Sequence, residues 1–384
     1  MPKPEPANAS EEHPRIVIAG GGVAALEALI ALRDLLDRIV SIEMVAPTGE
    51  FVYRPLSVTE PFGSAASPRF DLAKIAADHG ASLHHGIVDA VDHDRMRVSL
   101  RGGRLLPFDV LLLAIGARPC EWLAGAIPFA GPEDVPRLRA LIGELEDGSV
   151  DRIIFTAPPA LHWTFPLYEL ALLTAARVAE RRLADVHLTI ATPEPSPLEV
   201  FGASATRHVR ELCADRGIAL KTAVRARSFE NGRLELESGE YLQAEGIVAL
   251  PELKGEPIAG VPCDDAGFIP VDEHGAVRGL PGVYAAGDGA RYPIKQGGLA
   301  AQQADAAAEA IAAYLGTDIE PQPFSARLRG ELLTGLEPTY LVARAAEAGS
   351  RESNIAFEPL WSPRGKIASR YLAPYLAELA SLRP

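Results

Sequence analysis

Apolar runs and amphipathic stretches alternate along most of the chain, a pattern typical of an α/β protein. Residues 15–19 form a short, β-branched-rich apolar run that ends at Gly20, as buried parallel strands do. Residues 23–36 place apolar side chains at three- and four-residue spacings, which predicts a helix. The same criteria predict further strands at 40–45, 153–156, 186–191, 247–250 and 283–286, and further helices at 165–182, 201–216 and 297–315.

The turn between the first strand and the first helix reads Gly20-x-Gly22-x-x-Ala25. Gly20 permits a tight turn, Gly22 lets a pyrophosphate approach the backbone, and Ala25 lets the helix pack close to the strand. The helix N-terminus adds free N–H groups and the positive end of a dipole. Dinucleotide binding is therefore predicted here, with Gly20, Gly22, Val23, Ala24 and Ala25 as candidates. A Gly-rich turn of an ordinary α/β protein is the alternative interpretation.

One element of this pattern is missing. An acidic residue normally ends the second strand and binds the ribose hydroxyls. Here the strand 40–45 is followed by Ala46-Pro47; Glu43 comes too early and Glu50 lies in the next loop.

A second motif, Pro281-Gly-Val-Tyr-Ala-Ala-Gly287-Asp288-Gly289, lies far along the chain and precedes the Ala-rich helix expected at 297–315. Together the two motifs resemble those of the pyridine nucleotide-disulfide oxidoreductase superfamily. Within it, the resemblance is to the branch of sulfide:quinone and type II NADH:quinone oxidoreductases. The matching segments are Gly20–Glu27, Phe51–Leu56, Leu111–Ala117, Gly287-Asp288 and Ile294–Gly298.

The resemblance implies two Rossmann-like, three-layer domains of FAD/NAD(P)-binding type, the second inserted in the first. FAD is the implied cofactor. The expected divisions are a disordered tail at 1–14, a discontinuous FAD-binding domain at 15–122 and 256–320, an inserted NAD(P)-type domain at 123–255, and a small C-terminal region at 321–384.

The resemblance also assigns residues to the cofactor. Arg54 and Pro55 are expected beside the flavin, and Ala114 and Gly116 close to the FAD. Val88 would offer its backbone to adenine. Gly287 and Asp288 would hold the ribityl chain, and Lys295, Gln296 and Gly297 would lie at the pyrimidine end of the flavin, where negative charge develops on reduction. Two departures, Ile115 and Arg278, each replace a usual Thr.

The inserted domain lacks its glycine turn. After the strand at 153–156 the chain reads Ala157-Pro158-Pro159-Ala160-Leu161-His162-Trp163. The two prolines remove N–H donors, and Trp163 and Phe165 stand where a pyrophosphate needs bare backbone. NAD(P)H binding in the usual pose is therefore disfavoured.

Three residues are candidates for chemistry. Lys295 would stabilise reduced flavin. His162 is a candidate proton carrier near neutral pH, although an ordinary turn histidine is the favoured interpretation. Cys120 lies near the place of one redox cysteine of the sulfide:quinone branch. Cys120, Cys213 and Cys263 offer no evident pair, so small structural thiols are the favoured interpretation and sulfide oxidation through cysteines is disfavoured.

Composition narrows the classes of protein and of binding partner that fit this chain. A net charge of −14 and a pI near 5.2 argue against a nucleic-acid partner. Three Cys without a CxxC motif argue against a disulfide scaffold or a metal site. No apolar run is long enough to span a bilayer, and Met1–Pro14 has no apolar core of a signal peptide, so a cytoplasmic location is expected.

The C-terminal segment contains an apolar set, Tyr371, Leu372, Tyr375, Leu376 and Leu379. Packing on the protein's own core or on a second subunit is favoured, because Pro374 is expected to interrupt the helix and basic residues are few. Peripheral membrane contact is the alternative, and the resemblance implies a homodimer.

Three functions remain open from the sequence. The favoured hypothesis is an FAD-dependent oxidoreductase that passes electrons from a donor other than conventionally bound NAD(P)H to a quinone or protein acceptor. The alternatives are an NAD(P)H dehydrogenase with a degraded nucleotide site, and a non-catalytic FAD-binding protein with a structural or sensory role.

Overall fold

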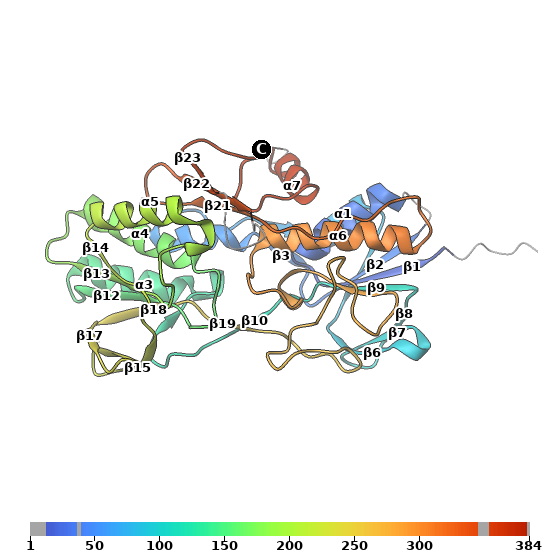
Figure 1. Cartoon of the computed structure of the whole chain (residues 1–384), viewed down its shortest axis with the longest axis horizontal. Helices are drawn as coiled ribbons and strands as arrows, with labels where there is room; N and C mark the ends of the chain where they lie inside the picture. The colour runs from blue at the N-terminus through green and yellow to red at the C-terminus, as the bar shows by residue number, and fades with distance from the viewer. Residues whose placement is uncertain (1–12, 37–39, 345–352, 382–384) are drawn as a thin grey trace, which may run out of the picture.

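The computed structural model describes residues 13–36, 40–344 and 353–381, so all but the last two residues of the tail expected at 1–14 lie outside it. The chain forms two parallel five-stranded sheets that lie side by side, with a C-terminal region across one face of both (Figure 1). The α/β architecture with Rossmann-like sheets predicted from the sequence is confirmed.

The first sheet has the order β20-β9-β1-β2-β5. Its strands are β1 (Arg15–Ala19), β2 (Ser41–Ala46), β5 (Ser82–His85), β9 (Val110–Leu113) and β20 (Val283–Ala285). Strands β1 and β9 are almost wholly buried because helices α1 (Val23–Leu36) and α6 (Gly297–Tyr314) cover one face of this sheet. Short elements surround its edge: β3 (Glu50–Val52), β4 (Arg69–Asp71), α2 (Leu72–Asp78) and the 3₁₀-helices η1 (Arg54–Phe62) and η5 (Gly287–Gly289). The antiparallel sheet on its other side consists of β6 (Val88–Asp92), β7 (Arg97–Leu100) and β8 (Leu105–Pro107), with η2 (His93–Arg95) in its first turn.

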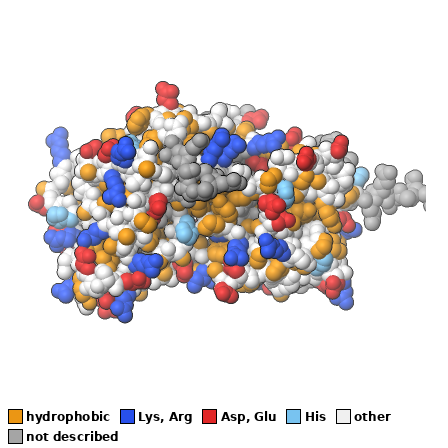
Figure 2. All heavy atoms as spheres, viewed as in Figure 1, with side chains coloured by type: hydrophobic (Ala, Val, Ile, Leu, Met, Phe, Trp, Pro, Cys, Tyr) orange, Lys and Arg blue, Asp and Glu red, His pale blue; other side chains and the backbone are white. Residues whose placement is uncertain are grey.

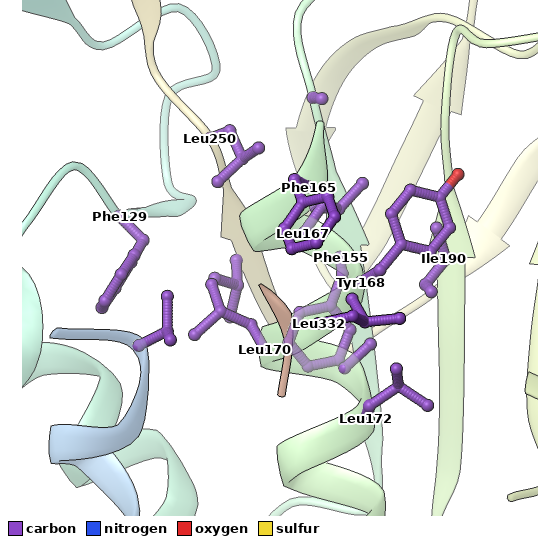
Figure 3. Close-up of a cluster of buried hydrophobic side chains, with 14 of the residues drawn as sticks. Phe129, Phe155, Phe165, Leu167, Tyr168, Leu170, Leu172, Ile190, Leu250 and Leu332 are labelled. Carbon is purple, nitrogen blue, oxygen red and sulfur yellow. The ribbon is translucent and has the colours of Figure 1, made fainter. Parts of the chain in front are cut away.

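The second sheet has the order β11-β18-β12-β13-β14. Its strands are β11 (Ile127–Pro128), β12 (Arg152–Thr156), β13 (His187–Ala191), β14 (Ile218–Lys221) and β18 (Gly246–Ala249). It packs against α3 (Val135–Asp147), α4 (Phe165–Arg181) and α5 (Ala203–Asp215), with 3₁₀-helices η3 (Pro132–Asp134) and η4 (Glu199–Phe201). Figure 3 shows its core, where Phe155, Leu167 and Tyr168 are wholly buried. A meander of β15 (Ala226–Glu230), β16 (Arg233–Leu236) and β17 (Tyr241–Gln243) adjoins it, and the paired strands β10 (Arg118–Cys120) and β19 (Glu252–Lys254) connect the two sheets.

The C-terminal region is a three-stranded antiparallel sheet followed by one helix: β21 (Arg327–Leu332), β22 (Thr339–Arg344), β23 (Ser353–Ala356) and α7 (Leu372–Ser381). Its sheet packs on the second core, while α7 packs on α1 of the first. The segment therefore bridges the two halves of the molecule.

The expectation that Pro374 interrupts the C-terminal helix is wrong. Pro374 lies in the first turn of α7, where the missing N–H would have had no helical partner. Leu372 and Leu376 are buried, and the apolar face of α7 is directed onto α1, as the favoured interpretation expected.

Candidate functional site

One cavity of 790 Å³ joins the two distant motifs. It lies at the carboxyl ends of β1, β2 and β9, where Rossmann-type sheets bind ligands. Its walls contain the following residues singled out from the sequence: Gly20, Gly22, Val23, Ala24, Arg54, Pro55, Val88, Ala114, Gly116, Gly287, Asp288, Lys295, Gln296 and Gly297. Ala25 is fully buried behind them, consistent with a packing role.

Gly20 and Gly22 are required for different reasons. Gly20 has φ +141°, and a Cβ there would lie 2.1 Å from the carbonyl oxygen of Ala114 on the neighbouring chain segment. A Cβ on Gly22 would meet nothing within 4 Å, because it would project into open space at the cavity wall. The first glycine therefore permits the turn, and the second leaves room for a ligand against the backbone.

The second motif is packed directly on the first. Gly287 has φ +80°, and a Cβ there would lie 2.9 Å from Cβ of Ala24. The N–H of Gly287 donates to Oε1 of Gln303 on α6 at 2.8 Å. Residues separated by most of the chain thus form one continuous wall.

Asp288 and Lys295 supply buried charge at this wall. Burial raises the pKa of Asp288, and Lys295 opposes that rise. Burial also lowers the pKa of Lys295 to about 8, against the attraction of Asp288 and Asp264. The ammonium of Lys295 donates to the carbonyl oxygen of Ala290 at 2.6 Å and lies 3.8 Å from the ring centroid of Phe268. Helix α6 begins just after Lys295, with Gln296 as its N-cap.

The helix start in the second domain is closed, unlike that of α1. Thr164 and Phe165 at the start of α4 are buried, and Trp163 stacks on Phe165 with 5.0 Å between ring centroids. A Cβ on Gly330 of β21 would lie 2.5 Å from the Phe165 ring, so the C-terminal sheet presses on this turn. The first N–H groups of α4 are consequently covered by protein.

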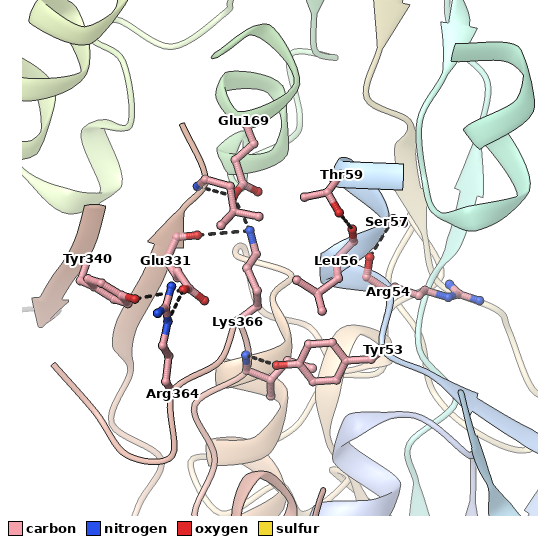
Figure 4. Close-up of polar contacts among 12 residues, drawn as sticks. Tyr53, Arg54, Leu56, Ser57, Thr59, Glu169, Glu331, Tyr340, Arg364 and Lys366 are labelled. Carbon is pink, nitrogen blue, oxygen red and sulfur yellow. Dashed lines mark hydrogen bonds and ion pairs between the residues drawn. The ribbon is translucent and has the colours of Figure 1, made fainter. Parts of the chain in front are cut away.

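A buried ion pair forms the far wall of the cavity. Lys366 and Glu169 line it, their side chains are 6% and 2% exposed, and the ammonium is paired with the carboxylate (Figure 4). Glu169 also accepts from the N–H of Leu333 at 2.9 Å, and Lys366 donates to the carbonyl oxygen of Glu331 at 3.2 Å. Burial raises the pKa of Glu169, and Lys366 opposes that rise.

Residues around this pair connect it to the surface and to Tyr53, the residue before η1. The carboxylate of Glu331 accepts from Tyr340 and from Arg364, each at 3.0 Å. The hydroxyl of Tyr53 accepts from the N–H of Ile367 at 2.8 Å, and burial raises the pKa of Tyr53 to about 12 (Figure 4). Tyr53 is therefore a neutral anchor for the segment that carries Lys366.

Comparisons with known proteins agree with this geometry. A family model described as pyridine nucleotide-disulphide oxidoreductase matches residues 170–310. An NADH dehydrogenase-like protein of Mycobacterium tuberculosis is 25% identical over 294 residues, which cover 71% of this chain and 72% of that protein. The structure of the sulfide:quinone oxidoreductase of Aquifex aeolicus superposes with a TM-score of 0.81 at 18% identity, over 90% of this chain and 87% of that one.

The chain is similar to members of the pyridine nucleotide-disulphide oxidoreductase superfamily. The resemblance predicted from the sequence is confirmed, and the protein is an oxidoreductase. A putidaredoxin reductase, solved in covalent complex with putidaredoxin, has the same fold, with a TM-score of 0.63 at 22% identity over 86% of this chain and 81% of that one.

His162 and Cys120 lie outside the main cavity of this oxidoreductase. His162 lines a second cavity of 1030 Å³, at the carboxyl ends of β12 and β13. Cys120 lies in β10, with Sγ 3.8 Å from the carbonyl oxygen of Arg118. Cys213 is buried, which raises its pKa to about 12, and Cys263 is exposed. The three thiols of this oxidoreductase are free, and none of them lines either cavity.

The Glu169–Lys366 pair was missed from the sequence. The available signal was a single acid within the apolar stretch Phe165–Ala171 of α4, although nothing local identified its partner. Among the described residues of this oxidoreductase, no cluster of three or more potential ligands could hold a metal ion, and no helix has the length and hydropathy to cross a bilayer.

Proposed function

We propose that this protein is an FAD-dependent oxidoreductase that passes electrons to a quinone or a protein acceptor, from a donor other than NAD(P)H in the usual pose. The observation that carries the proposal is the single cavity shared by the two motifs and bounded by the closed turn of the second domain. The FAD-binding domain then comprises 15–122 and 256–320, with the second domain at 123–255.

The cavity fits FAD on the evidence of its own backbone. The open position at Gly22 and the uncovered start of α1 suit a pyrophosphate, and Arg54 adds positive charge to the same wall. Asp288 supplies an acceptor for hydroxyl groups, and Lys295 a cation at the start of α6. When bound, the flavin would supply two-electron transfer between donor and acceptor.

The closed turn supports a donor other than conventionally bound NAD(P)H. A pyrophosphate needs exposed N–H groups at the helix start, whereas Thr164 and Phe165 are buried there. Trp163 and Phe165 instead line the main cavity and give it an aromatic wall. Such a wall suits a flat apolar electron carrier better than a nucleotide phosphate.

The buried ion pair supports an acceptor that takes up protons. Reduction of a quinone to a quinol requires two electrons and two protons. Lys366 and Glu169 hold an exchangeable proton at the cavity wall, and Glu331, whose carboxylate is paired with Arg364, lines the same cavity beside them. We assign Lys366 and Glu169 the delivery of protons to the bound acceptor.

The alternative of an NAD(P)H dehydrogenase has one observation in its favour. Glu194 follows β13, the place of the ribose-binding acid in such domains, and it lines the second cavity. Its carboxylate, however, already accepts from Tyr168 at 2.7 Å and from Thr192 at 3.0 Å. We therefore rank this function second.

One experiment separates these functions. The purified, flavin-loaded protein is mixed without oxygen with NADH, NADPH or sulfide, and loss of the oxidised flavin absorption is followed before a soluble quinone is added. Slow or absent bleaching by both nicotinamide nucleotides, with rapid reoxidation by quinone after chemical reduction, is expected. Rapid bleaching by NADH would establish the alternative. A protein that cannot hold FAD would refute the proposed function altogether.

Membrane contact through α7 is not proposed, because the apolar face of that helix is packed on α1. The exposed apolar side chains of the C-terminal region are Leu336, Phe357 and Leu360. The side chains in Figure 2 show both charge signs interspersed over the visible face, without a continuous basic region.

A further inference from the structure

The adenosine end of the cavity lacks its usual acid. Strand β2 ends at Ala46 and continues into Pro47, and neither side chain accepts a hydrogen bond. Glu43, the acid within β2, does not line the cavity; its carboxylate is bonded to Nε2 of His84 at 2.6 Å. The ribose hydroxyls of a bound FAD therefore need a different acceptor.

Six carboxylates line the cavity, and one of them follows β2 directly. They are Glu50, Glu133, Glu169, Glu256, Asp288 and Glu331. Asp288 belongs to the second motif, and Glu169 and Glu331 belong to the ion-pair wall. Glu133 lies in η3 of the second domain, and Glu256 follows β19. Only Glu50, the first residue of β3, stands beside the end of β2.

The position of Glu50 is fixed by its surroundings. The Thr48 hydroxyl donates to the Glu50 carbonyl at 3.2 Å, and the N–H of Leu72 donates to the Gly49 carbonyl at 2.9 Å. Arg69 of β4 donates to the Glu50 carboxylate at 3.1 Å and lines the same cavity. The Glu50 side chain is nevertheless 57% exposed. A carboxylate has about four acceptor sites, so one guanidinium contact leaves capacity for two hydroxyls.

The surrounding chain also belongs to the adenosine end. Gly86, after β5, donates to the Ala46 carbonyl at 3.0 Å and lines the cavity with Ile87 and Val88. We propose that Glu50 accepts hydrogen bonds from the adenosine ribose hydroxyls of FAD, with Arg69 as a positioning residue. This inference rests on the proposed function, because it takes FAD as the ligand.

The first test compares the affinity for FAD of full-length variants, measured from the release of fluorescent flavin. Glu50→Gln keeps the shape and removes the charge, and a 10- to 100-fold weaker Kd is expected, roughly the value of hydrogen bonds to a charged group. The control is Asp89→Asn, an equal change of charge at an exposed residue that follows Val88 and does not line the cavity. Wild-type affinity is expected for this control.

The second test adds a comparison made on the wild-type protein itself. Wild-type protein is reconstituted with an FAD analogue that lacks both adenosine ribose hydroxyls, and weaker binding than of FAD by a similar factor is expected. Glu50→Gln should bind the two flavins alike. Equal affinity of the wild type for both flavins, or unchanged FAD affinity in Glu50→Gln, overturns the inference alone. A wild type that binds neither flavin overturns the proposed function with it.

Discussion

At the scale of residues, the first glycine motif combines a folding requirement with a binding requirement. The positive φ of Gly20, and the 2.1 Å that would separate an added Cβ from the Ala114 carbonyl oxygen, concern the protein alone. The open space at Gly22 concerns a ligand. Mutation to alanine separates the folding requirement from the binding requirement. A methyl group at Gly20 would meet protein atoms, whereas one at Gly22 would not.

Gly20→Ala is expected to lower the free energy of unfolding by about 2 to 5 kcal/mol, from backbone strain and overpacking. Gly22→Ala is its matched control, and should change stability by no more than about 1 kcal/mol while weakening FAD binding. Thermal melts of the flavin-free variants and flavin titrations measure both effects. Equal destabilisation by the two substitutions would contradict the assignment.

The lowered pKa of Lys295 predicts that the redox potential of the bound flavin depends on pH. With a pKa near 8, its ammonium is charged in neutral solution and loses its charge as the pH rises further. Lys295→Met should therefore lower the midpoint potential at neutral pH, by about 30 mV for each 1.4 kcal/mol of lost stabilisation in a two-electron couple. The difference between wild type and variant should shrink above pH 8. Potentiometric titration at several pH values checks this, and a constant difference would count against Lys295.

At the scale of elements, helices α1, α6 and α7 meet at a buried acid, Glu27, and a half-buried one, Asp305. Glu27 of α1 accepts from the N–H groups of Arg370, Tyr371 and Leu372, which places a carboxylate at the start of α7. Asp305 of α6 lies beside it. Burial, and then the charge of Glu27, raise the pKa of Asp305 to about 8, whereas Arg370 opposes the rise.

The raised pKa of Asp305 predicts how the stability of the fold changes with pH. The pKa of Asp305 is higher in the folded state than its ordinary value of 3.8, so its contribution to stability is full below 3.8 and is lost as the pH rises towards 8. Asp305→Asn should thus melt at a higher temperature than wild type at pH 8, and the gap should narrow in acid. Melting curves over this range test it, with Asp318→Asn, at an exposed site after α6, as the control. A gap that widens in acid would contradict the prediction.

The local sequence pattern was sufficient to predict most helices and strands, but not the contacts between residues far apart in the chain. The helix expected at 23–36 matches α1, and that at 165–182 ends one residue later than α4. By contrast, Glu169 and Lys366 are separated by 197 positions, and no periodicity links them. His162 was a candidate for the flavin site, but the turn after β12 places it at the second cavity, while Phe165 is buried against Gly330 of β21.

At the scale of the whole molecule, the cavity depends on both sheets and on the C-terminal region. Arg139 and Arg177 of the second domain donate to the carbonyls of Glu60 and Phe62 in η1, and Val58 is buried in the second core. The C-terminal sheet packs on the second domain while α7 packs on the first. The parts are therefore expected to unfold together.

Saturation with FAD should raise the single melting transition of the whole chain, since residues from all three parts line the cavity proposed to hold it. At 100 times Kd the gain is about 2.7 kcal/mol. Differential scanning calorimetry with and without FAD measures it. Two separate transitions, only one of which moves with FAD, would show that the domains fold independently.

The contact of Glu27 with α7 has a consequence for synthesis. The two partners are 345 positions apart, so the first motif leaves the ribosome long before Lys366 and Ile367 exist to complete the cavity wall. A nascent chain can form the Gly20 turn early, but its cavity stays open on the side that Lys366 and Ile367 later line. Firm retention of the FAD proposed for this cavity would then await translation of the segment around residue 372, and cofactor loading would be a late event in the synthesis of each molecule.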